Sequence, residues 1–402
     1  MRDILMIVHT MGTLDPKDND RYTYIAKRII AEYSNCHIEI VTSDFEHHKK
    51  KYRDPQIQNY HPFQITFLHE NKYKKNISIR RIMSHYSFAL RLKKYLQNRK
   101  KPDVIYCAVP PITSANVAAS YAKKNNIKFI IDVQDLWPES FTIALGDNCF
   151  SRAVLSPLMK RVNRVYAAAD IAFSVSQTYA DRIRKANSIA KIQSVYLGTD
   201  LSEYDIDLKE SENVKPKEEF WIAYVGNLGN SYDFDVLFRA LEQASKSVDG
   251  RIVMHILGDG NNRNIVEGLA KQHHPDTIFY GYLPYDKMFN ILKQCDVAVN
   301  PIKPGTSSSV VNKVGDYAAA GIAVVNTQDN EEYRKLVDEN YLGINAIPGD
   351  SDSLSRAIIF LYNNENARRN MGNNNRFLYE SSFDRKHTYT PIIEALSEES
   401  FK

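Results

Sequence analysis

Two halves of this chain repeat one pattern, in which short runs of β-branched residues alternate with amphipathic helical segments. Such alternation is typical of parallel, doubly wound sheets covered by helices on both faces. The chain is therefore predicted to be α/β, with two Rossmann-like domains. The predicted strands cover residues 4–9, 37–42, 104–107, 129–133, 220–225, 251–257, 277–280, 297–300 and 323–326, and clear helical periodicity covers 21–33, 115–124 and 234–244.

A polar stretch rich in acid and lysine, residues 202–219, separates the two halves and is predicted to be a linker. The predicted N-terminal domain is 1–201, and the predicted C-terminal domain is 220–380. Residues 381–402 are expected to form a helix that packs back on the N-terminal domain. Doubly wound domains bind nucleotides at the carboxyl ends of their strands, so we expect the two domains to face a central ligand cleft.

The cysteines and the hydropathy restrict the class of protein. Four widely spaced cysteines without a C-x-x-C pair argue against a zinc site or a disulfide framework, and they fit a reducing cytosol. No window holds eighteen apolar residues, so membrane contact is expected to be peripheral. The net charge of +4 combines +13 in residues 1–200 with −9 in the remainder. This imbalance either reflects chance and ordinary solvated faces, or it indicates that the basic half meets something anionic, such as phospholipid, a lipid pyrophosphate or nucleic acid.

Residues 71–102 are the most basic part of this half, with eleven Lys or Arg and no acid. Apolar residues recur among them at roughly helical spacing, namely Ile77, Ile79, Ile82, Met83, Tyr86, Leu90 and Leu92. A basic amphipathic helix of this kind is typical of proteins that bind anionic membranes. A solvated helix with an ordinary core face is the alternative. The predicted membrane-binding residues are Lys74, Lys75, Arg80, Arg81, Lys93 and Lys94.

Glycines follow the first strand of each half. Gly226 and Gly229 follow the strand in YVGNLGN, and Gly12 follows the first strand of the chain. Glycine there lets backbone N–H groups approach a phosphate, and a helix N-terminus adds partial positive charge. Neither motif is G-x-G-x-x-G, so a nicotinamide cofactor is not favoured. The LGDG turn that ends at Gly260 is a tight turn by itself.

Two further clusters carry polar side chains. In DVQDLWPES, Asp135 and Trp137 place a carboxylate and an aromatic ring after a strand, although they could also be a helix cap and a core residue. In the segment 304–326, Lys313 and Asp316 are three residues apart and lie on one helical face. Asp316 could accept hydrogen bonds from ribose hydroxyls, and a surface ion pair with Lys313 is the alternative.

Taken together, the motifs YVGNLG, LGDG, FYGYLPYDKMFNILKQCDVAVNP and NKVGDYAAAGIAVV resemble the donor-binding half of glycosyltransferase family 4, whose members are retaining enzymes of the GT-B fold. The resemblance continues upstream in KPDVIYCAVPPIT, IDVQDLWPES, AAADIAFSVSQTYADRI and YLGTD, so it covers nearly the whole chain in the family's order. The DLWPES block most resembles the bacterial branch that builds capsules, O-antigens and exopolysaccharides.

The resemblance implies roles for single residues. Asp316 would bind the donor ribose, Lys313 would lie near the diphosphate, and Asp135 would lie near the sugar, which makes Asp135 and Lys313 the catalytic candidates. The family needs no metal, and the nucleotide-sugar is a co-substrate rather than a cofactor. The implied donor-binding residues are Gly12, Gly226, Asn227, Gly260, Arg263, Gly281, Tyr282, Ser307, Ser308, Ser309, Lys313 and Asp316.

The chain also departs from the family pattern. Ser308 stands where the family has the first acid of its E-x7-E motif, and Gln134 replaces a histidine. Asn227 and Tyr232 stand where an arginine and a lysine are usual, so a charge for the leaving diphosphate is missing from its common position. Lys313, Arg263 or a basic residue of the N-terminal domain must then supply it.

The expected function is transfer of a sugar from a nucleotide-sugar, with UDP favoured over GDP, to a lipid-linked saccharide at the cytoplasmic face of the cell membrane. A catalytically silent nucleotide-sugar-binding protein is the main alternative, given the departures above. A UDP-sugar 2-epimerase of similar fold would need acids and a histidine around the sugar that the sequence lacks. A nucleic-acid partner is not expected, because the aromatic residues follow core periodicity.

Overall fold

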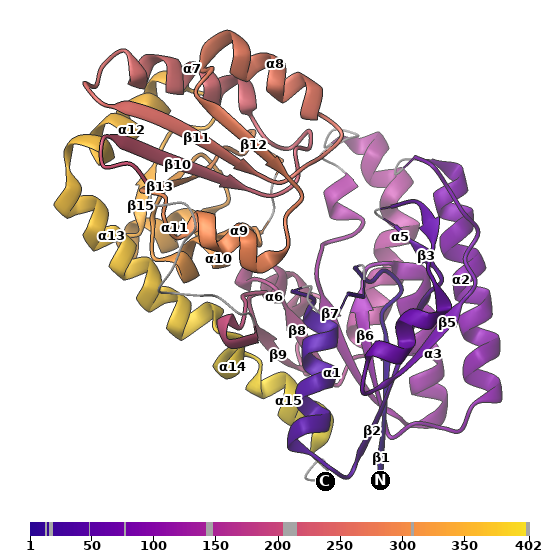
Figure 1. Cartoon of the computed structure of the whole chain (residues 1–402). Coiled ribbons are helices and arrows are strands. Elements are labelled where there is room, and N and C mark those ends of the chain that lie inside the picture. The colour runs from indigo at the N-terminus through magenta and orange to yellow at the C-terminus, as the bar shows by residue number, and fades with distance from the viewer. Residues whose placement is uncertain are drawn as a thin grey trace. The chain divides into compact units, whose positions relative to one another are not determined.

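The structure of the protein is a computed structural model, and it divides the chain into two compact units (Figure 1). Unit 1 contains Met1–Val195 and the chain from Tyr389 onward, and unit 2 contains Tyr196–Thr388. Each unit is built on one parallel sheet, so the predicted α/β class with two Rossmann-like domains is confirmed. The structure describes residues 1–12, 14, 15, 19–47, 49–75, 78–141, 148–203, 215–306 and 309–398.

Unit 1 has a seven-stranded sheet in the order β5-β2-β1-β6-β7-β8-β9, with every neighbouring pair parallel. The inner strands β1 and β6 are apolar on both faces, as expected for a parallel sheet that helices cover on two sides. The strands are β1 (Arg2–Ile7), β2 (Cys36–Ser43), β5 (Gln64–Leu68), β6 (Val104–Val109), β7 (Lys128–Val133), β8 (Ile171–Ser174) and β9 (Lys191–Ser194), and a small hairpin joins β3 (Phe45–Glu46) to β4 (Lys51–Tyr52).

Helices cover both faces of this sheet (Figure 1). On one face, α1 (Arg21–Glu32) and α15 (Thr390–Ser397) share a hydrophobic core with alternate residues of β1, β2 and β6. On the other face lie α2 (Ile79–Asn98), α3 (Ile112–Asn125) and α5 (Cys149–Ala167). The remaining elements of the unit are α6 (Gln177–Arg184), η1 (Pro55–Tyr60) and η2 (Glu139–Phe141).

Unit 2 has a six-stranded parallel sheet in the order β12-β11-β10-β13-β14-β15. Successive residues of β10 face opposite sides of the sheet and belong to two separate hydrophobic cores, so the sheet is buried on both sides. The strands are β10 (Glu219–Val225), β11 (Arg251–Leu257), β12 (Thr277–Gly281), β13 (Val297–Asn300), β14 (Ala323–Asn326) and β15 (Gly343–Asn345).

The helices of unit 2 divide between these two cores. The core on one face contains α7 (Phe234–Ser245), α8 (Arg263–His273) and α12 (Ser351–Asn363). The core on the other contains α9 (Tyr285–Leu292), α10 (Lys313–Ala320) and α11 (Glu331–Glu339). The other elements are η3 (Leu201–Glu203), α13 (Glu365–Leu378), η4 (Tyr379–Phe383) and α14 (Arg385–Thr388).

The first division between the units lies between Val195 and Tyr196, six residues before the predicted domain end at 201. The reason is local packing, because Thr199 N donates to Phe383 O (3.0 Å). A Cβ on Gly198 would lie 1.9 Å from that same carbonyl oxygen, so only glycine allows the contact. Most of the predicted linker, residues 204–214, lies outside the described residues.

The chain from Tyr389 onward returns to unit 1, where the yellow helix α15 lies beside the indigo helix α1 in Figure 1. A buried polar network supports this contact. Arg21 donates to both carboxylate oxygens of Asp132 (2.8 and 3.2 Å) and to the Tyr389 hydroxyl (2.9 Å). Tyr106 and Gln134 donate to the same carboxylate, so Asp132 has four donors and is fully buried.

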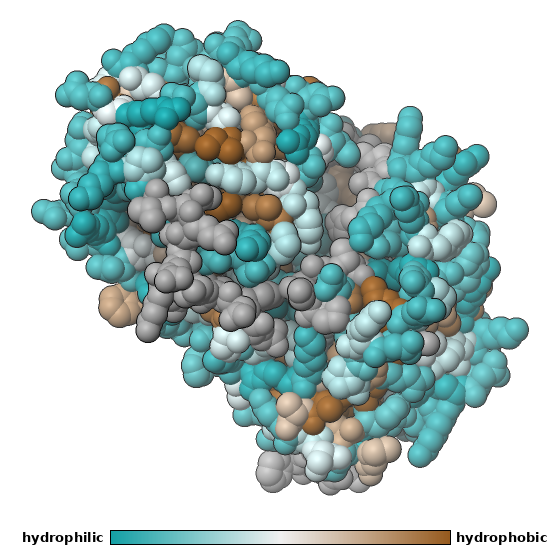
Figure 2. Space-filling view, viewed as in Figure 1, coloured by the Kyte–Doolittle hydropathy of each residue, from teal (hydrophilic) through white to brown (hydrophobic). Residues whose placement is uncertain are grey.

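Hydrophilic side chains cover most of the surface of each unit in the view of Figure 2, and the hydrophobic ones form small separate patches. None of the helices in the described part of the chain is long and apolar enough to cross a bilayer.

Candidate functional site

Unit 2 has a topological switch point between β10 and β13. The chain passes from β10 to β11 on one side, while β13 pairs with the other side of β10. The loops that follow β10 and β13 run together, because Tyr232 pairs with Ile302 and Lys303 N donates to Ser231 O (2.9 Å). Ligands of open α/β sheets bind at such points, so these loops form the candidate site.

The glycines of the two predicted loops allow close backbone packing. Gly226 has a φ of +128°, and a Cβ on Gly258 would lie 2.0 Å from Gly226 O. A Cβ on Gly260 would lie 2.4 Å from Asn227 Oδ1. These positions therefore tolerate only glycine, and they hold the loop after β10 against the loop after β11.

In this packing, backbone N–H groups that were expected to approach a phosphate donate to backbone carbonyl oxygens instead. Gly226 N donates to Leu257 O (2.9 Å), Leu228 N to Asp259 O (2.9 Å) and Gly229 N to Asn227 O (3.0 Å). Since these three donors already have acceptors, a bound phosphate needs positive charge from another group.

Lys313 begins α10 and points into this region. Its side chain is only 5% exposed, and its Nζ lies 3.8 Å from the ring centroids of both Tyr224 and Tyr232. Burial lowers the pKa of Lys313 well below its ordinary value, and the nearby Asp316 carboxylate opposes this shift only in part. The alternative of a surface ion pair is therefore wrong, because Lys313 is not at the surface.

Asp316 lies one turn further along α10, which ends at Ala320 and is capped by Gly321 with a φ of +66°. The hydroxyl of Tyr285, from α9, donates to Asp316 Oδ1 (2.8 Å). Burial raises the pKa of Asp316 to about 6, against the opposing effects of Tyr285, Arg385 and Lys313. An acid that ionises near neutral pH can bind a ribose as a carboxylate at pH 7 and lose that ability in mild acid.

The other predicted donor-binding residues of unit 2 have varied surroundings. Arg263 donates to Glu267 (2.8 Å) and Asp259 (3.4 Å), so two carboxylates already balance its charge. A Cβ on Gly281 would lie 3.2 Å from Arg263 Nη1, and the neighbouring Tyr282 is 73% exposed. Ser309 is buried, and its carbonyl oxygen accepts a hydrogen bond from Gln328. Ser307 and Ser308 lie outside the described residues.

In unit 1, Asp135 follows β7 at the carboxyl edge of the sheet. Its Oδ2 accepts from the Trp137 indole (2.8 Å), and its Oδ1 accepts from Leu136 N (2.8 Å) and the Tyr179 hydroxyl (3.4 Å). Burial raises the pKa of Asp135, although these hydrogen bonds oppose the shift. The turn and the indole therefore hold the carboxylate in a fixed orientation. Gly12 lies after β1 at the same edge, where a Cβ would be 3.9 Å from the nearest side-chain atom.

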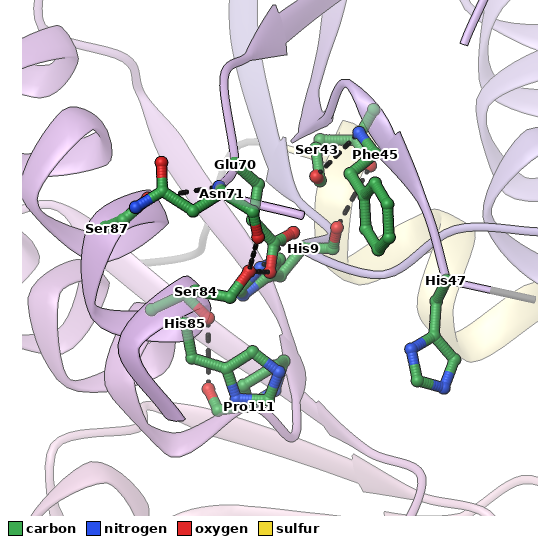
Figure 3. A network of polar contacts seen from close by, with 12 residues as sticks. His9, Ser43, Phe45, His47, Glu70, Asn71, Ser84, His85, Ser87 and Pro111 are labelled. Atoms are coloured by element: carbon green, nitrogen blue, oxygen red, sulfur yellow. Dashed lines mark hydrogen bonds and ion pairs between the residues drawn. The ribbon is translucent and has the colours of Figure 1, made fainter. Parts of the chain in front are cut away.

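Sequence reasoning missed a polar network at this edge, where the side chains of His9, Glu70 and Ser84 point toward one another in Figure 3. His9 Nε2 lies 3.0 Å from Glu70 Oε2, and Ser84 Oγ donates to Glu70 Oε1 (2.6 Å). Burial disfavours ionisation of Glu70, but its contacts with His9, Ser43 and Ser84 together outweigh this effect and lower its pKa to about 2. His9 also stacks on Phe88 of α2, with 3.8 Å between ring centroids. The network therefore fixes α2 to the end of β1.

The exposed surface of α2 carries an unusual apolar stripe. Its core face consists of Ser84, His85, Phe88, Ala89, Leu92 and Leu96, yet a second set of large apolar side chains faces outward. This exposed set is Ile79, Ile82, Met83, Tyr86 and Leu90, which are spaced as one helical face. Helix α2 therefore has both the ordinary core face of the alternative and a separate exposed apolar face. Leu92, predicted as part of the stripe, belongs to the core face instead, and Ile77 lies outside the described residues.

The basic residues predicted with this stripe fall into two groups. Lys74, Lys75, Arg80, Lys93 and Lys94 are exposed. Arg81 instead lies over the Trp137 ring, 5.2 Å from its centroid, and faces the body of unit 1. A cavity of about 380 Å³ adjoins the stripe between α2, α3 and α5, and Leu90, Lys93 and Arg161 contribute to its lining.

Comparison with known proteins identifies both halves of the chain. Residues 9–203 match the family described as Glycosyltransferase Family 4, and residues 205–377 match the family described as Glycosyl transferases group 1. An uncharacterized glycosyltransferase from Methanocaldococcus jannaschii is 23% identical over 213 residues, which are 51% of this chain and 53% of that protein. The match thus spans about half the length of this curated relative.

Solved structures share the fold at low sequence identity. Sucrose-phosphate synthase from Thermosynechococcus elongatus matches with a TM-score of 0.71 and 14% identity over 98% of this chain and 97% of that one. HepE of Anabaena in complex with UDP-glucose matches with a TM-score of 0.68 and 15% identity over 99% and 100%. WaaG, a glycosyltransferase of lipopolysaccharide biosynthesis, matches with a TM-score of 0.68 and 12% identity over 98% and 100%. With a family 4 domain followed by a group 1 domain on two Rossmann-like sheets, the chain belongs to the glycosyltransferases of the GT-B type.

Proposed function

We propose that this protein is a retaining glycosyltransferase that moves a sugar from a UDP-sugar to a lipid-linked saccharide in surface polysaccharide biosynthesis. The observation that carries the donor half of the proposal is the buried Lys313 beside the glycine loop after β10, with Asp316 one turn further along α10. HepE of Anabaena, which has the same fold, was solved with UDP and with UDP-glucose, and this favours UDP as the nucleotide.

In this proposal each donor-site residue meets one part of the nucleotide-sugar. Asp316, as a carboxylate, accepts hydrogen bonds from the ribose hydroxyls, and the backbone around Gly281 lies near the base. Lys313 supplies positive charge to the diphosphate, where negative charge grows as the sugar leaves. No metal is needed if the lysine and the N-terminus of α10 stabilise that charge.

The proposed chemical step exchanges one bond for another at the anomeric carbon. The bond from this carbon to the β-phosphate oxygen breaks, and a bond to the acceptor oxygen forms on the same face of the sugar. The acceptor's hydroxyl proton passes to the departing β-phosphate and leaves with UDP. No protein side chain then has to act as the base, and Asp135 is assigned to holding the sugar.

The acceptor half of the proposal concerns the α2 surface. Its exposed apolar stripe, flanked by Arg80, Lys93 and Lys94, fits the interface of an anionic bilayer, where each basic side chain contributes about 1 kcal/mol. We place the protein at the cytoplasmic face of the cell membrane, with unit 1 binding the lipid-linked saccharide.

A thermal-shift comparison of free nucleotides tests the donor assignment. UDP at a hundred times its Kd is expected to stabilise the protein by about 2.7 kcal/mol, with a smaller effect from GDP at the same concentration. Equal stabilisation by both would overturn the assignment of UDP, and no stabilisation by either would overturn the donor site itself.

A further inference from the structure

Lys313 is a buried cation without a conventional partner. Its Nζ has no hydrogen-bond acceptor among the described residues, although the side chain is only 5% exposed. Removing an ammonium from water without an ion pair or hydrogen bonds is strongly unfavourable. A protein keeps such a group when a ligand, or a different kind of contact, compensates for the lost water.

Two tyrosine rings provide such a contact. Nζ lies 3.8 Å from the ring centroids of both Tyr224 and Tyr232, and the two rings meet edge to face at 79°. The negative faces of aromatic rings attract a cation, most strongly where water is excluded. Each ring is also held in place, because the Tyr224 hydroxyl donates to Asn227 O (2.7 Å) and the Tyr232 backbone pairs with Ile302.

The rings of Tyr224 and Tyr232 form an aromatic cage around Lys313 Nζ, and this cage lies where a phosphate would be bound. A Cβ on Gly226 would be 3.4 Å from Nζ, so the ammonium adjoins the loop that follows β10 at the switch point. The three loop N–H groups described above already have carbonyl acceptors. Arg263, the other candidate cation of unit 2, is bonded to Asp259 and Glu267. Of these two cations, Lys313 is the one without a carboxylate within hydrogen-bonding distance among the described residues.

The residue types in the loop after β10 indicate why a cation from α10 is needed there. The loop after β10, residues 226–233, contains no lysine or arginine. Position 232 has an aromatic ring, and the Lys313 ammonium from α10 lies against that ring.

We propose that Tyr224 and Tyr232 are positioning residues that hold the Lys313 ammonium for the donor's diphosphate, so that charge absent from the loop after β10 is supplied from α10. The inference rests on the proposed donor site and adds the residues that position its cation. When a diphosphate binds, the flexible lysine stem lets Nζ turn toward the phosphate oxygens while the rings continue to cover the methylene groups.

The test compares the affinities of UDP and uridine, since only UDP carries the diphosphate. Tyr232→Leu removes the ring, Tyr232→Phe keeps it, and Lys313→Met removes the charge. Tyr232→Leu and Lys313→Met are each expected to weaken UDP binding by at least about ten-fold and uridine binding by less than about two-fold. Tyr232→Phe is expected to bind both ligands like wild type. Lys335→Met, at an exposed lysine of α11, is the matched control.

A charge relocation makes the test independent of the stability of Tyr232→Leu. In the double variant Lys313→Met with Tyr232→Lys, a cation returns to the loop, and UDP affinity is expected to recover by at least about three-fold over Lys313→Met. The inference is overturned if folded Tyr232→Leu binds UDP like wild type, if UDP and uridine weaken together, or if the double variant regains nothing. If wild type binds uridine and UDP equally, the proposed diphosphate site fails, and if it binds neither, the whole donor site fails.

Discussion

At the scale of single residues, Lys313 and Asp316 lie on one turn of α10, yet each side chain has partners of its own. Lys313 lies between two tyrosine rings, and Asp316 accepts a hydrogen bond from Tyr285. Burial lowers the pKa of the lysine and raises that of the acid, so it disfavours the charged form of both. Burial by itself therefore favours the neutral forms of both side chains, and an anionic ligand would favour the protonated lysine.

The raised pKa of Asp316 predicts how donor binding depends on pH. The acid takes up a proton as the pH falls through about 6, and the neutral acid is a weaker acceptor for ribose hydroxyls. Affinity for UDP-glucose, whose diphosphate has no proton to titrate in this range, is expected to fall by up to about ten-fold per pH unit below 6. Calorimetric titration at several pH values checks this.

The control for that titration is Asp316→Asn, which is expected to bind UDP-glucose more weakly at pH 7 and with no such pH dependence. In the free protein, the contribution of Asp316 to folding stability depends on pH in the opposite direction. The raised pKa means that the folded state holds the proton more tightly, so this group's contribution to stability falls as the pH rises from about 4 to 6. A wild-type affinity that stays constant from pH 7 to pH 5 would contradict the ribose role.

The buried pair of Arg21 and Asp132 makes a prediction about stability. Arg21→Met leaves the Asp132 carboxylate fully buried without its bidentate partner, and a broken buried pair of this kind costs about 3–5 kcal/mol. Arg28→Met, on the same helix, removes an i,i+4 pair with Glu32 near the surface and a contact with the Tyr24 ring, and it is expected to cost about 0.5–1 kcal/mol. Urea denaturation compares the two, and equal losses would contradict the assigned importance of the network.

Local spacing placed Lys313 and Asp316 on one helical face, and the family resemblance implied their roles in the donor site. Local spacing could not predict the cage, since Tyr224 and Lys313 are 89 positions apart in the sequence and meet only through sheet packing. The pair of His9 and Glu70 was missed for a related reason. Glu70 follows β5, a short strand with an exposed first residue that has no clear apolar pattern in the sequence.

At the scale of elements, strands with continuous apolar runs could be predicted almost to the residue. The predicted segments 251–257, 297–300 and 323–326 coincide with β11, β13 and β14. The edge strands β5, β9 and β15 were missed because they are short and only partly buried, so their composition resembles that of loops. The inner strand β8 was missed as well, because its four residues form too short an apolar run. Pairing with a neighbouring strand, rather than local propensity, makes them strands.

The exposed stripe of α2 predicts binding to anionic vesicles. Wild type is expected to sediment with phosphatidylglycerol vesicles more than with phosphatidylcholine vesicles, and less at high salt. Arg80→Glu combined with Lys94→Glu is expected to weaken this binding by at least about ten-fold, and Ile82→Ser with Leu90→Ser should weaken it at any salt concentration.

The matched control is Lys123→Glu with Lys124→Glu, which reverses two exposed charges of α3 away from the stripe. This variant is expected to bind vesicles nearly like wild type. If the α2 and α3 variants lose binding equally, the net charge of unit 1 is responsible rather than the α2 surface.

The burial of α15 against α1 and β1 predicts that this helix stabilises unit 1. Leu396 is fully buried in the core shared with α1 and β1, so Leu396→Ala is expected to cost about 2–5 kcal/mol. Glu394→Ala, at an exposed position of the same helix, is expected to change stability by about 0.5 kcal/mol or less. In a Trp221→Phe background, the fluorescence of Trp137 reports unit 1 alone, and equal effects of the two substitutions would contradict this role.

At the scale of the whole molecule, the repeated strand–helix pattern was enough to predict two doubly wound sheets. The division between the units could not be placed from composition, because the YLGTD segment looks like the end of the first half. It belongs to unit 2 through contacts with residues near 383, almost 190 positions away in the sequence. Such contacts depend on the completed fold.

The central claim is that this chain transfers sugar from a UDP-sugar and does not merely bind it. The most direct measurement is the release of UDP from a panel of UDP-sugars, with and without a synthetic polyprenyl-pyrophosphate-linked N-acetylhexosamine. We predict multiple turnovers with one donor, faster with the acceptor than without it, and loss of turnover in Lys313→Met. Stoichiometric binding of UDP-sugars without turnover in either condition would contradict the claim and identify a silent binding protein.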